Sequence, residues 1–203
     1  MMAVIEDLAR KSAAKREPGD YVQDGLLYCG HCRTPKQCRI DVAGRLIIVG
    51  CQCACATRRF EAERKAQKEA EQRARIESLR DCGIRDKSLT ECKFSAAKCT
   101  PELQKCKRYV DAWAEMSAGN NGLLLWGGTG NGKTYAAACI ANDLIDRGIP
   151  AMITSLPRIL NAGWDMQTII EQMHKYPLVI LDDLSAERNS DYAREIVYLV
   201  IDE

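Results

Sequence analysis

The sequence lacks any long hydrophobic run. Its longest apolar stretches, "GLLLW" at 122–126 and "PLVIL" at 177–181, are far shorter than the about 20 residues that a membrane-spanning helix needs. The first residues, "MMAVIEDLARKSAAKR", hold no apolar stretch that could form a signal peptide. We therefore expect a soluble, cytoplasmic protein with no membrane partner.

The sequence also lacks a charge imbalance. Its 29 lysine and arginine residues are matched by 28 aspartate and glutamate residues, so the formal net charge is +1. Composition alone therefore neither predicts nor excludes a nucleic-acid partner, which would have to bind a local basic patch. With 203 residues, the chain is long enough for one good core and a smaller module, but short for two full domains.

Cysteine, in contrast, is abundant, with 11 residues. In a reducing compartment this number favours metal ligands or small buried side chains over disulfides. Six cysteines lie between Cys29 and Cys55, whereas the other five are scattered singly, without the spacing of a chelate, and are predicted to be packing residues. These five are Cys82, Cys92, Cys99, Cys106 and Cys139.

The clustered cysteines have the spacing of a zinc site. "CGHC" at 29–32 and "CQCAC" at 51–55 are two close sets separated by about twenty residues, typical of two arms that chelate a tetrahedral Zn²⁺. Between them, "RIDVAGRLIIV" predicts a β-hairpin that turns at "AG". Four thiolates would leave no open coordination position, so we expect a structural zinc; a patch of free thiols is the alternative. The predicted ligands are Cys29, Cys32, Cys53 and Cys55, with Cys51 able to replace either of the last two, and His31 and Cys38 spare.

Three further segments surround this module. A helix is predicted over residues 3–16, ended by "EPGD". Residues 57–80 are nearly all helix formers with almost no apolar stripe, which predicts an exposed spacer; a coiled partner surface or a nucleic-acid contact are alternatives. Its predicted ion pairs are Glu61–Lys65, Glu69–Arg73 and Glu71–Arg75. The predicted division is an N-terminal segment 1–28, a zinc module 29–56, a charged helix 57–80, a linker 81–100 and an ATPase domain 101–203.

The sequence from Thr100 onward predicts a parallel α/β domain. Thr100 caps a helix that has Pro101 in its first turn and ends at "AGNNG". Beyond it strands alternate with helices, which is typical of a parallel sheet. The apolar face of the first helix consists of Leu103, Cys106, Val110 and Trp113. The other predicted elements are strands at 123–126, 151–154 and 178–183, a helix at 134–146 closed by Gly148, one helix at 155–176 or two with a break at "NAG", and a last helix from near Asp191.

The stretch "GGTGNGKT" at 127–134 matches the phosphate-binding pattern G-x-x-x-x-G-K-[ST] in a turn between a predicted strand and helix. Its glycines let backbone N–H groups converge on an anion, and the positive end of the following helix faces the same hollow. Lys133 would reach the β and γ phosphates of ATP, and the Thr134 hydroxyl would bind Mg²⁺. The flanking elements disfavour a chance match. The predicted nucleotide-binding residues here are Gly127, Gly128, Thr129, Gly130, Asn131, Gly132, Lys133 and Thr134.

"LVILDDL" at 178–184 ends a hydrophobic strand with two carboxylates, Asp182 and Asp183, where a buried strand would not tolerate charge. In a parallel sheet both emerge at the carboxyl edge, beside the phosphate-binding loop. We expect Asp182 to hold Mg²⁺, directly or through water, and Asp183 to orient or deprotonate the attacking water. Lys133 and Asp183 are thus the predicted catalytic residues. The alternative is that the acidic pair merely caps the next segment.

Three stretches resemble the DnaC-type replicative helicase loaders, especially those of phages and mobile elements of Gram-positive bacteria. They are "GLLLWGGTGNGKTYAAACIANDLIDRGIPAMITS", "LVILDDLSAERNSDYAREIVYLVID" and "GLLYCGHCRTPKQCRI", and the resemblance covers most of the chain from about Tyr21. It implies an AAA+ ATPase with a P-loop NTPase three-layer αβα core, related to the IstB-type transposition helper ATPases. It also implies that ATP is used to place a DnaB-like ring helicase on single-stranded DNA. The zinc module would contact the helicase, with which the protein would form a homo-oligomeric assembly.

The sequence departs from this family in three places. Most AAA+ proteins have Asp-Glu where this chain has Asp182 and Asp183, and the shorter reach of the second aspartate predicts slow hydrolysis. Ser185 stands where the family commonly has glycine. The chain ends at "YLVIDE", whereas family members continue into two further strands, a polar sensor, an arginine finger and a helical lid. The chain would then be either a fragment or a truncated relative, and we expect its C-terminally truncated ATPase core to bind nucleotide weakly and to hydrolyse ATP very poorly, since an arginine finger is worth about 10³ to 10⁵ in rate.

Alternative functions share parts of this chemistry. An IstB-like transposition helper would use the same site with a transposase as its partner. An adaptor would use the nucleotide only as a switch, and a small-molecule P-loop kinase would need an acceptor pocket of which the sequence shows no sign. DNA contact by basic clusters competes with simple solvation of surface charge. These clusters are Arg10, Lys11, Lys15 and Arg16, and Arg58, Arg59, Arg64 and Lys65.

Overall fold

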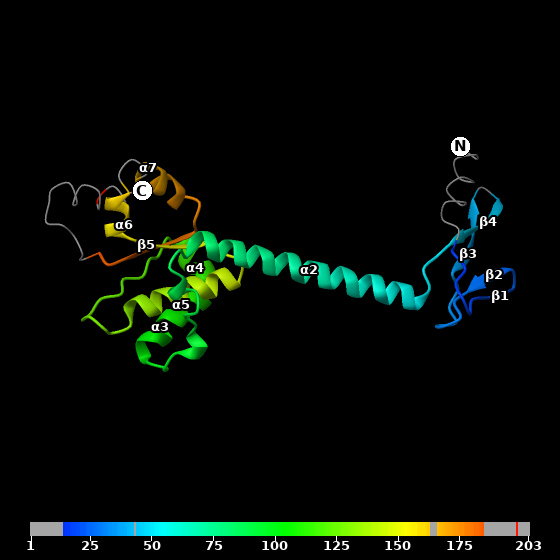
Figure 1. Ribbon diagram of the computed structural model, residues 1–203, viewed down its shortest axis with the longest axis horizontal. Coiled ribbons are helices and arrows are strands. Elements are labelled where there is room, and N and C mark those ends of the chain that lie inside the picture. Colours follow the sequence, from blue (N-terminus) through cyan, green and yellow to red (C-terminus); the bar gives the residue numbers. More distant parts are fainter. Residues whose placement is uncertain (1–13, 43, 163–165, 185–197, 199–203) are drawn as a thin grey trace. The chain divides into compact units, whose positions relative to one another are not determined.

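The computed structural model describes residues 14–42, 44–162, 166–184 and 198 of the chain (Figure 1). The chain divides into two compact units, Met1–Glu71 and Gln72–Glu203. The long helix α2 (Ala54–Gly83) runs through the boundary between them. Each unit is described below by itself.

The first unit contains two small antiparallel hairpins. Asp24 and Gly25 both have positive φ, 50° and 73°, as the two-residue turn of a type I′ hairpin requires. In the second hairpin the pairing runs from Gln37 with Gly50 to Val42 with Arg45, which confirms the predicted hairpin. The four strands are β1 (Tyr21–Gln23), β2 (Leu26–Tyr28), β3 (Gln37–Val42) and β4 (Arg45–Gly50).

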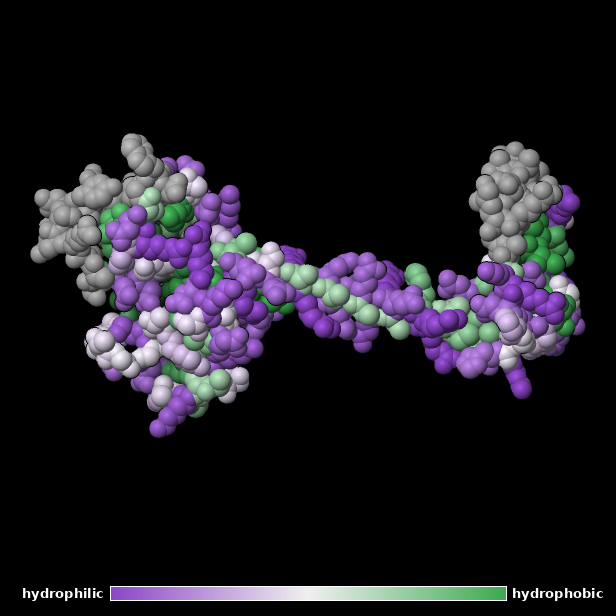
Figure 2. All heavy atoms as spheres, in the orientation of Figure 1, coloured by the Kyte–Doolittle hydropathy of each residue, from purple (hydrophilic) through white to green (hydrophobic). Residues whose placement is uncertain are grey.

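Helix α2 is longer than the predicted range of 57–80, because it begins at Ala54 and ends at Gly83. Every residue from 58 to 75 is exposed, and hydrophilic side chains cover most of this stretch in Figure 2. The predicted exposure of this stretch is therefore confirmed, although a narrow, weakly apolar band runs along it in Figure 2. Lys65 and Glu69 form an ion pair of 4.0 Å along this surface, which solvent screening makes weak.

The second unit has a parallel strand pair with helices on both faces (Figure 1). Strand β5 (Ala151–Ser155) pairs with β6 (Leu178–Asp182), and Ile84 forms a parallel bridge to Ile153 on the other edge of β5. Side chains alternate along a strand, so Met152 packs toward the helices of one face and Ile153 toward α5 on the other. The helices are α5 (Lys133–Asp146) on one face and α6 (Leu156–Asn161) and α7 (Met166–Met173) on the other. These elements agree with a mixed α/β fold, including the predicted break near "NAG".

Helix α3 (Pro101–Asp111) packs its apolar face against α5. Thr100 caps it as predicted, since its hydroxyl accepts a hydrogen bond from the Leu103 N–H at 3.2 Å. Cys106 and Val110 are buried and contact Ile140 and Leu144 of α5 in one cluster. The predicted single helix is interrupted at Ala112, beyond which α4 (Trp113–Ala118) continues to the predicted stop.

The predicted strand at 123–126 is wrong within the described structure, which assigns no strand to it. Leu124 and Trp126 are 73% and 87% exposed, and Leu125 alone of this stretch packs on the cluster around α3 and α5. A central strand must be covered on both faces and paired along its edges. Among the described residues nothing pairs with this stretch, so its apolar composition misled the prediction.

The predicted polar linker at 81–100 in fact supplies core residues. Ile84 is 2% exposed beside β5, and Cys92 packs against Ala138 and Cys139 of α5. Two short 3₁₀ turns order the segment, η1 (Lys87–Leu89) and η2 (Phe94–Ala96). Cys92, Cys106 and Cys139 are buried as predicted, whereas Cys82 and Cys99 are exposed, so the packing prediction is wrong for those two.

A buried amide ties this segment to α5. Asn142 is 1% exposed, and its Nδ2 donates to the carbonyls of Leu89, Cys92 and Ala138 at 2.7, 3.1 and 2.9 Å. Its Oδ1 accepts from Arg80 Nε at 3.2 Å, so donor and acceptor are both satisfied. Polar residues such as Asn142 can thus order a segment that an apolar pattern does not reveal.

Two predicted helices lie mainly outside the described residues. One is the predicted N-terminal helix, and residues 14–16, which the structure describes, are not helical. The other is the last predicted helix, from near Asp191. Ser185 also lies outside. No helix of the described part of the chain is long and apolar enough to cross a membrane.

Candidate functional site

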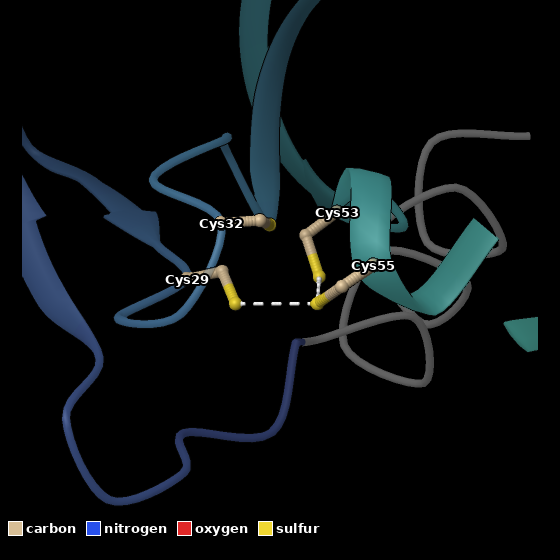
Figure 3. Close-up of side chains that lie close together, drawn as sticks. All are labelled: Cys29, Cys32, Cys53 and Cys55. Carbon is tan, nitrogen blue, oxygen red and sulfur yellow. Dashed lines mark hydrogen bonds between the residues drawn. The ribbon is translucent and has the colours of Figure 1, made fainter. Parts of the chain in front are cut away.

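The four cysteines predicted as zinc ligands lie together in the first unit. The Sγ atoms of Cys29, Cys32, Cys53 and Cys55 all lie within 4.8 Å of one another, and Figure 3 shows the side chains converging from two segments. The Cys29–Cys55 and Cys53–Cys55 sulfur distances are 3.6 and 3.3 Å. A tetrahedron with Zn–S bonds of about 2.3 Å has S–S edges of about 3.8 Å. The cluster therefore fits a zinc ion in number, type and spacing of donors.

The first pair of thiols sits on a tight backbone turn after β2. The Arg33 N–H donates to the Cys29 carbonyl and the Cys29 N–H to the Thr34 carbonyl, both at 2.9 Å. Arg33 itself has φ of 57°. A Cβ on Gly30 would lie 2.0 Å from the Gly19 carbonyl oxygen, so this position accepts glycine alone. The turn thereby holds both thiols on one side.

The second pair of thiols lies at the start of α2. Cys53 immediately precedes the helix and Cys55 is in its first turn, where unpaired N–H groups favour a thiolate. Thr34 links the two pairs, because its hydroxyl contacts Cys32 Sγ at 3.0 Å and accepts from the Ala54 N–H at 2.8 Å. One hydroxyl therefore sets the position of the helix relative to the turn.

The four thiols differ in acidity, as expected of a crowded set of thiols. Hydrogen bonds from Thr34 lower the pKa of the Cys32 thiol to about 5. Hydrogen bonding to the neighbouring thiols of Cys53, Cys32 and Cys29 raises the pKa of Cys55 to about 12. The last proton is held because a further thiolate would add negative charge to a crowded set of sulfur atoms. A divalent metal removes this opposition, since metal binding and thiol deprotonation are coupled.

A buried ion pair supports the turn. Asp20 is 7% exposed; its Oδ2 accepts from Lys36 Nζ at 2.7 Å and from the Glu17 N–H at 2.8 Å. Its Oδ1 accepts from the Gly30 N–H at 3.1 Å, next to Cys29. The hydrogen bond from Lys36 lowers the pKa of Asp20 to about 2. Sequence reasoning missed Asp20, Lys36 and Thr34, for which the cysteine spacing carries no signal.

We expect Lys36→Met to destabilise the first unit, because it leaves the buried Asp20 carboxylate without its cation. The folded pKa of Asp20, about 2, is below its unfolded value of about 3.9. The stability that the ionised Asp20 contributes is therefore complete above pH about 3.9, the unfolded pKa, and is lost as pH falls toward 2. The loss in Tm caused by Lys36→Met should accordingly be equal at pH 6 and pH 8. If Lys36→Met lowers the Tm less in a protein that already carries Asp20→Asn than in the wild type, the ion pair is confirmed. An equal loss in both backgrounds would contradict it.

The remaining cysteines of the cluster lie outside the four-thiol group. Cys51 directs its Sγ to the Pro35 carbonyl at 3.5 Å, and burial with the neighbouring Cys38 thiol raises its pKa. Among the described residues, the group that could hold a metal consists of the four predicted cysteines without Cys51, Cys38 or His31. The geometry thus favours Cys53 and Cys55 over Cys51.

The predicted phosphate-binding loop leads into α5 in the second unit. Its glycines Gly127, Gly130 and Gly132 have φ of 142°, 83° and 76°, a region that side chains disfavour. Gly132 is the N-cap of α5, and no side chain caps that end. The first amides of a helix without such a cap are available to an anion.

Lys133 folds back over this loop. Its Nζ donates to the carbonyls of Gly127 and Gly128 at 3.0 and 2.9 Å. The ammonium group therefore lies over the exposed loop, where phosphate oxygens would be stronger, charged acceptors than the two carbonyls. The arrangement is chemically suited to an anion held between the loop amides and Lys133.

The end of β6 lies at the same edge as this loop. Leu178 and Ile180 pack toward α5, and Asp182 shares their face because side chains alternate along the strand. A short turn at 147–150 joins α5 to β5, so α5 runs back along the sheet and its first turn lies at the carboxyl edge. Asp182 is half-buried there, and the exposed Asp183 follows with φ of 53°. The predicted nucleotide residues thus share one edge of one unit.

The chain is similar to curated replicative helicase loaders. It is 24% identical to the replicative helicase loader DnaI of Bacillus subtilis (strain 168) over 179 residues, which cover 83% of this chain and 57% of DnaI. With the replicative helicase loader DnaC of Escherichia coli (strain K12) it shares 25% identity over 108 residues, which cover 49% of this chain and 43% of DnaC.

These relationships support the predicted resemblance at the level of the DnaC-like loaders. The chain spans about half the length of the curated relatives it matches. No protein-family model matches it. The narrower predictions, of a phage or mobile-element origin and of an IstB-like relationship, remain predictions.

Proposed function

We propose that this protein is an ATP-binding helicase loader that acts with a DnaB-like ring helicase on single-stranded DNA in replication. The observation that carries the proposal is the similarity to DnaI over 83% of the chain. A match of that extent is longer than the second unit alone, so it includes part of the first unit as well. The similarity therefore concerns a combination of two modules, which a P-loop alone would not explain.

The chemistry of the two units suggests a division of roles. A closed four-thiolate site has no coordination position for a substrate, so the first unit would serve as a partner-binding module, here for the helicase. The glycine loop of the second unit would bind Mg²⁺-ATP. Its amides and Lys133 would hold the phosphates, Thr134 and Asp182 would hold Mg²⁺, and Asp183 would orient the attacking water. In assembly with the ring helicase the protein would be oligomeric.

Removing the ammonium group at Lys133 tests the nucleotide site. We expect Lys133→Ala to weaken the binding of a fluorescent ATP analogue, in the presence of Mg²⁺, by at least about tenfold, because a charge-assisted contact to phosphate is lost. Lys175→Ala removes an exposed lysine from the same unit and should leave the affinity unchanged. Equal affinities for the two variants would exclude the proposed site.

Partner capture tests the loader assignment. Purified chain, loaded with zinc and ATP, should retain a DnaB-like ring helicase from a defined mixture of that helicase and a transposase. Retention of the transposase instead would favour the IstB-like alternative and overturn the proposal. Asp183→Asn separates a loader from an adaptor, since an adaptor would keep its function after ATP hydrolysis is lost.

A further inference from the structure

We propose that the hydroxyl of Thr34 donates a hydrogen bond to the metal-bound sulfur of Cys32 and thereby helps to set the zinc affinity of the four-thiol group. Thr34 lies two residues after Cys32, in the segment between β2 and β3. Its Oγ1 lies 3.0 Å from the Cys32 sulfur. Thr34 would not itself bind the metal, so it is a positioning residue of the site. The inference rests on the zinc site described above.

The state of the sulfur decides which atom donates in this contact. A metal-bound cysteine is a thiolate, which has no proton to donate. The Thr34 hydroxyl has one proton and two lone pairs, and it already accepts a hydrogen bond from the Ala54 N–H at 2.8 Å. Its own proton is therefore left for the thiolate of Cys32. A hydrogen bond to such a charged acceptor is about twice as strong as one between neutral groups.

Thr34 contacts both arms of the site. Its carbonyl accepts from the Cys29 N–H at 2.9 Å, and its hydroxyl contacts Cys32 on the same arm. On the other arm, Ala54 lies between the second pair of thiols and is the first residue of α2, where the N–H groups have no acceptor within the helix. One hydroxyl therefore joins the two arms and also donates to one of the thiolates.

The donated hydrogen bond affects metal binding through charge. Four thiolates outweigh the charge of a divalent cation, so the ligands repel one another even in the metal-bound site. The O–H of Thr34 offsets part of the negative charge on Cys32. Hydrogen bonds from residues around a metal site typically change its metal affinity by about 10- to 100-fold. We therefore expect the loss of this hydroxyl to be measurable as weaker zinc binding.

The first test is the zinc affinity of the full chain, measured by competition with a chromophoric chelator. Thr34→Val keeps the shape of the side chain and removes its hydroxyl, so it should weaken zinc binding by at least about tenfold. Thr34→Ser keeps the hydroxyl and should restore the wild-type affinity. Thr57→Val is the matched control, because Thr57 lies two residues after Cys55 and its hydroxyl forms no hydrogen bond in the described structure. It should leave the affinity unchanged.

Cobalt separates donation to the sulfur from a purely structural role. In the cobalt-loaded chain, Thr34→Val should shift the sulfur-to-metal charge-transfer band to longer wavelength, because a donor no longer stabilises the electrons of the Cys32 sulfur. The d–d bands of tetrahedral cobalt should keep their positions, since the four sulfur ligands remain. A loss of affinity without a shift of the charge-transfer band would show that Thr34 only supports the start of α2, and would overturn the proposal.

A measurement on the wild type does not depend on the folding of a variant. In the chain loaded with an NMR-active cadmium isotope, the Thr34 hydroxyl proton should exchange slowly and couple to the metal through the Cys32 sulfur. Absence of this coupled proton would overturn the proposal, as would equal zinc affinities of Thr34→Val and wild type. Failure of the wild type to bind any metal would overturn the zinc site and this inference with it. These measurements need neither ATP nor a helicase, so the loader function is tested separately.

Discussion

Cys53→Ser is expected to abolish zinc binding and to unfold the first unit. Structural zinc contributes about 10 to 16 kcal/mol of apparent binding free energy in zinc-finger peptides at neutral pH, which matches or exceeds the total stability of most small domains. In the described part of this unit, the buried apolar residues are Leu27, Cys29 and Cys53. With so small a core in the described residues, we expect a bound zinc ion to contribute much of the stability of the two hairpins.

The measurements are zinc content per chain and the dispersion of amide NMR signals from residues 14–53. Wild type should contain one zinc per chain, and Cys53→Ser none, with collapsed dispersion. Cys51→Ser is the matched control, since Cys51 lies two residues away and outside the four-thiol group. Should Cys51→Ser lose the metal while Cys53→Ser retains it, the assigned ligand set would be incorrect.

Cysteine spacing was a sufficient signal for the thiol cluster because chelation is a local constraint. Two close pairs, one on a turn and one at the start of a helix, can meet only if a hairpin brings them together, and the residues between them predicted that hairpin. The residues that support the cluster could not be predicted, because they act through tertiary hydrogen bonds: Asp20 accepts from Lys36 and from the Gly30 N–H, and Thr34 accepts from the Ala54 N–H. Such contacts depend on where a turn places the backbone, which no residue pattern specifies.

In the second unit, most helices and strands were predictable from the sequence, whereas the packing of two segments was not. Helix α5, both paired strands and the cap at Thr100 were predictable, because each has a periodic apolar pattern or a local hydrogen bond. Two errors came from tertiary structure. The apolar run at 123–126 is not a strand among the described residues, and the polar segment at 81–100 packs into the core. The composition of a segment indicates whether its side chains favour burial, whereas the elements packed around it determine whether they are buried.

The end of α2 illustrates how this core is assembled. Gly83 ends the helix against β5, and Ile84 then pairs with Ile153. Arg80, one turn earlier, forms an ion pair with Asp146 and a hydrogen bond with Asn142, both on α5. The C-terminal end of α2 is therefore fixed to α5, the helix that follows the predicted phosphate-binding loop.

Gly83→Ala is expected to destabilise the second unit by about 3 kcal/mol and to lower its Tm by roughly 10 °C. The Cβ of alanine would lie 1.9 Å from the Ala151 carbonyl oxygen, a backbone atom that cannot move without shifting β5. The φ of Gly83 is not positive, so the expected loss is steric and does not come from an unfavourable backbone conformation. Thermal unfolding followed by circular dichroism and by differential scanning calorimetry measures it.

Ser78→Ala provides the comparison on the same helix. Ser78 is exposed, so its substitution should change the free energy of unfolding by less than about 0.5 kcal/mol. If Gly83→Ala were as stable as Ser78→Ala, α2 would not pack closely on β5, and Ile84 and Asn142 would lose their role in the core. A large loss confined to Gly83→Ala would instead show that the end of α2 belongs to the same folded unit as the predicted phosphate-binding loop.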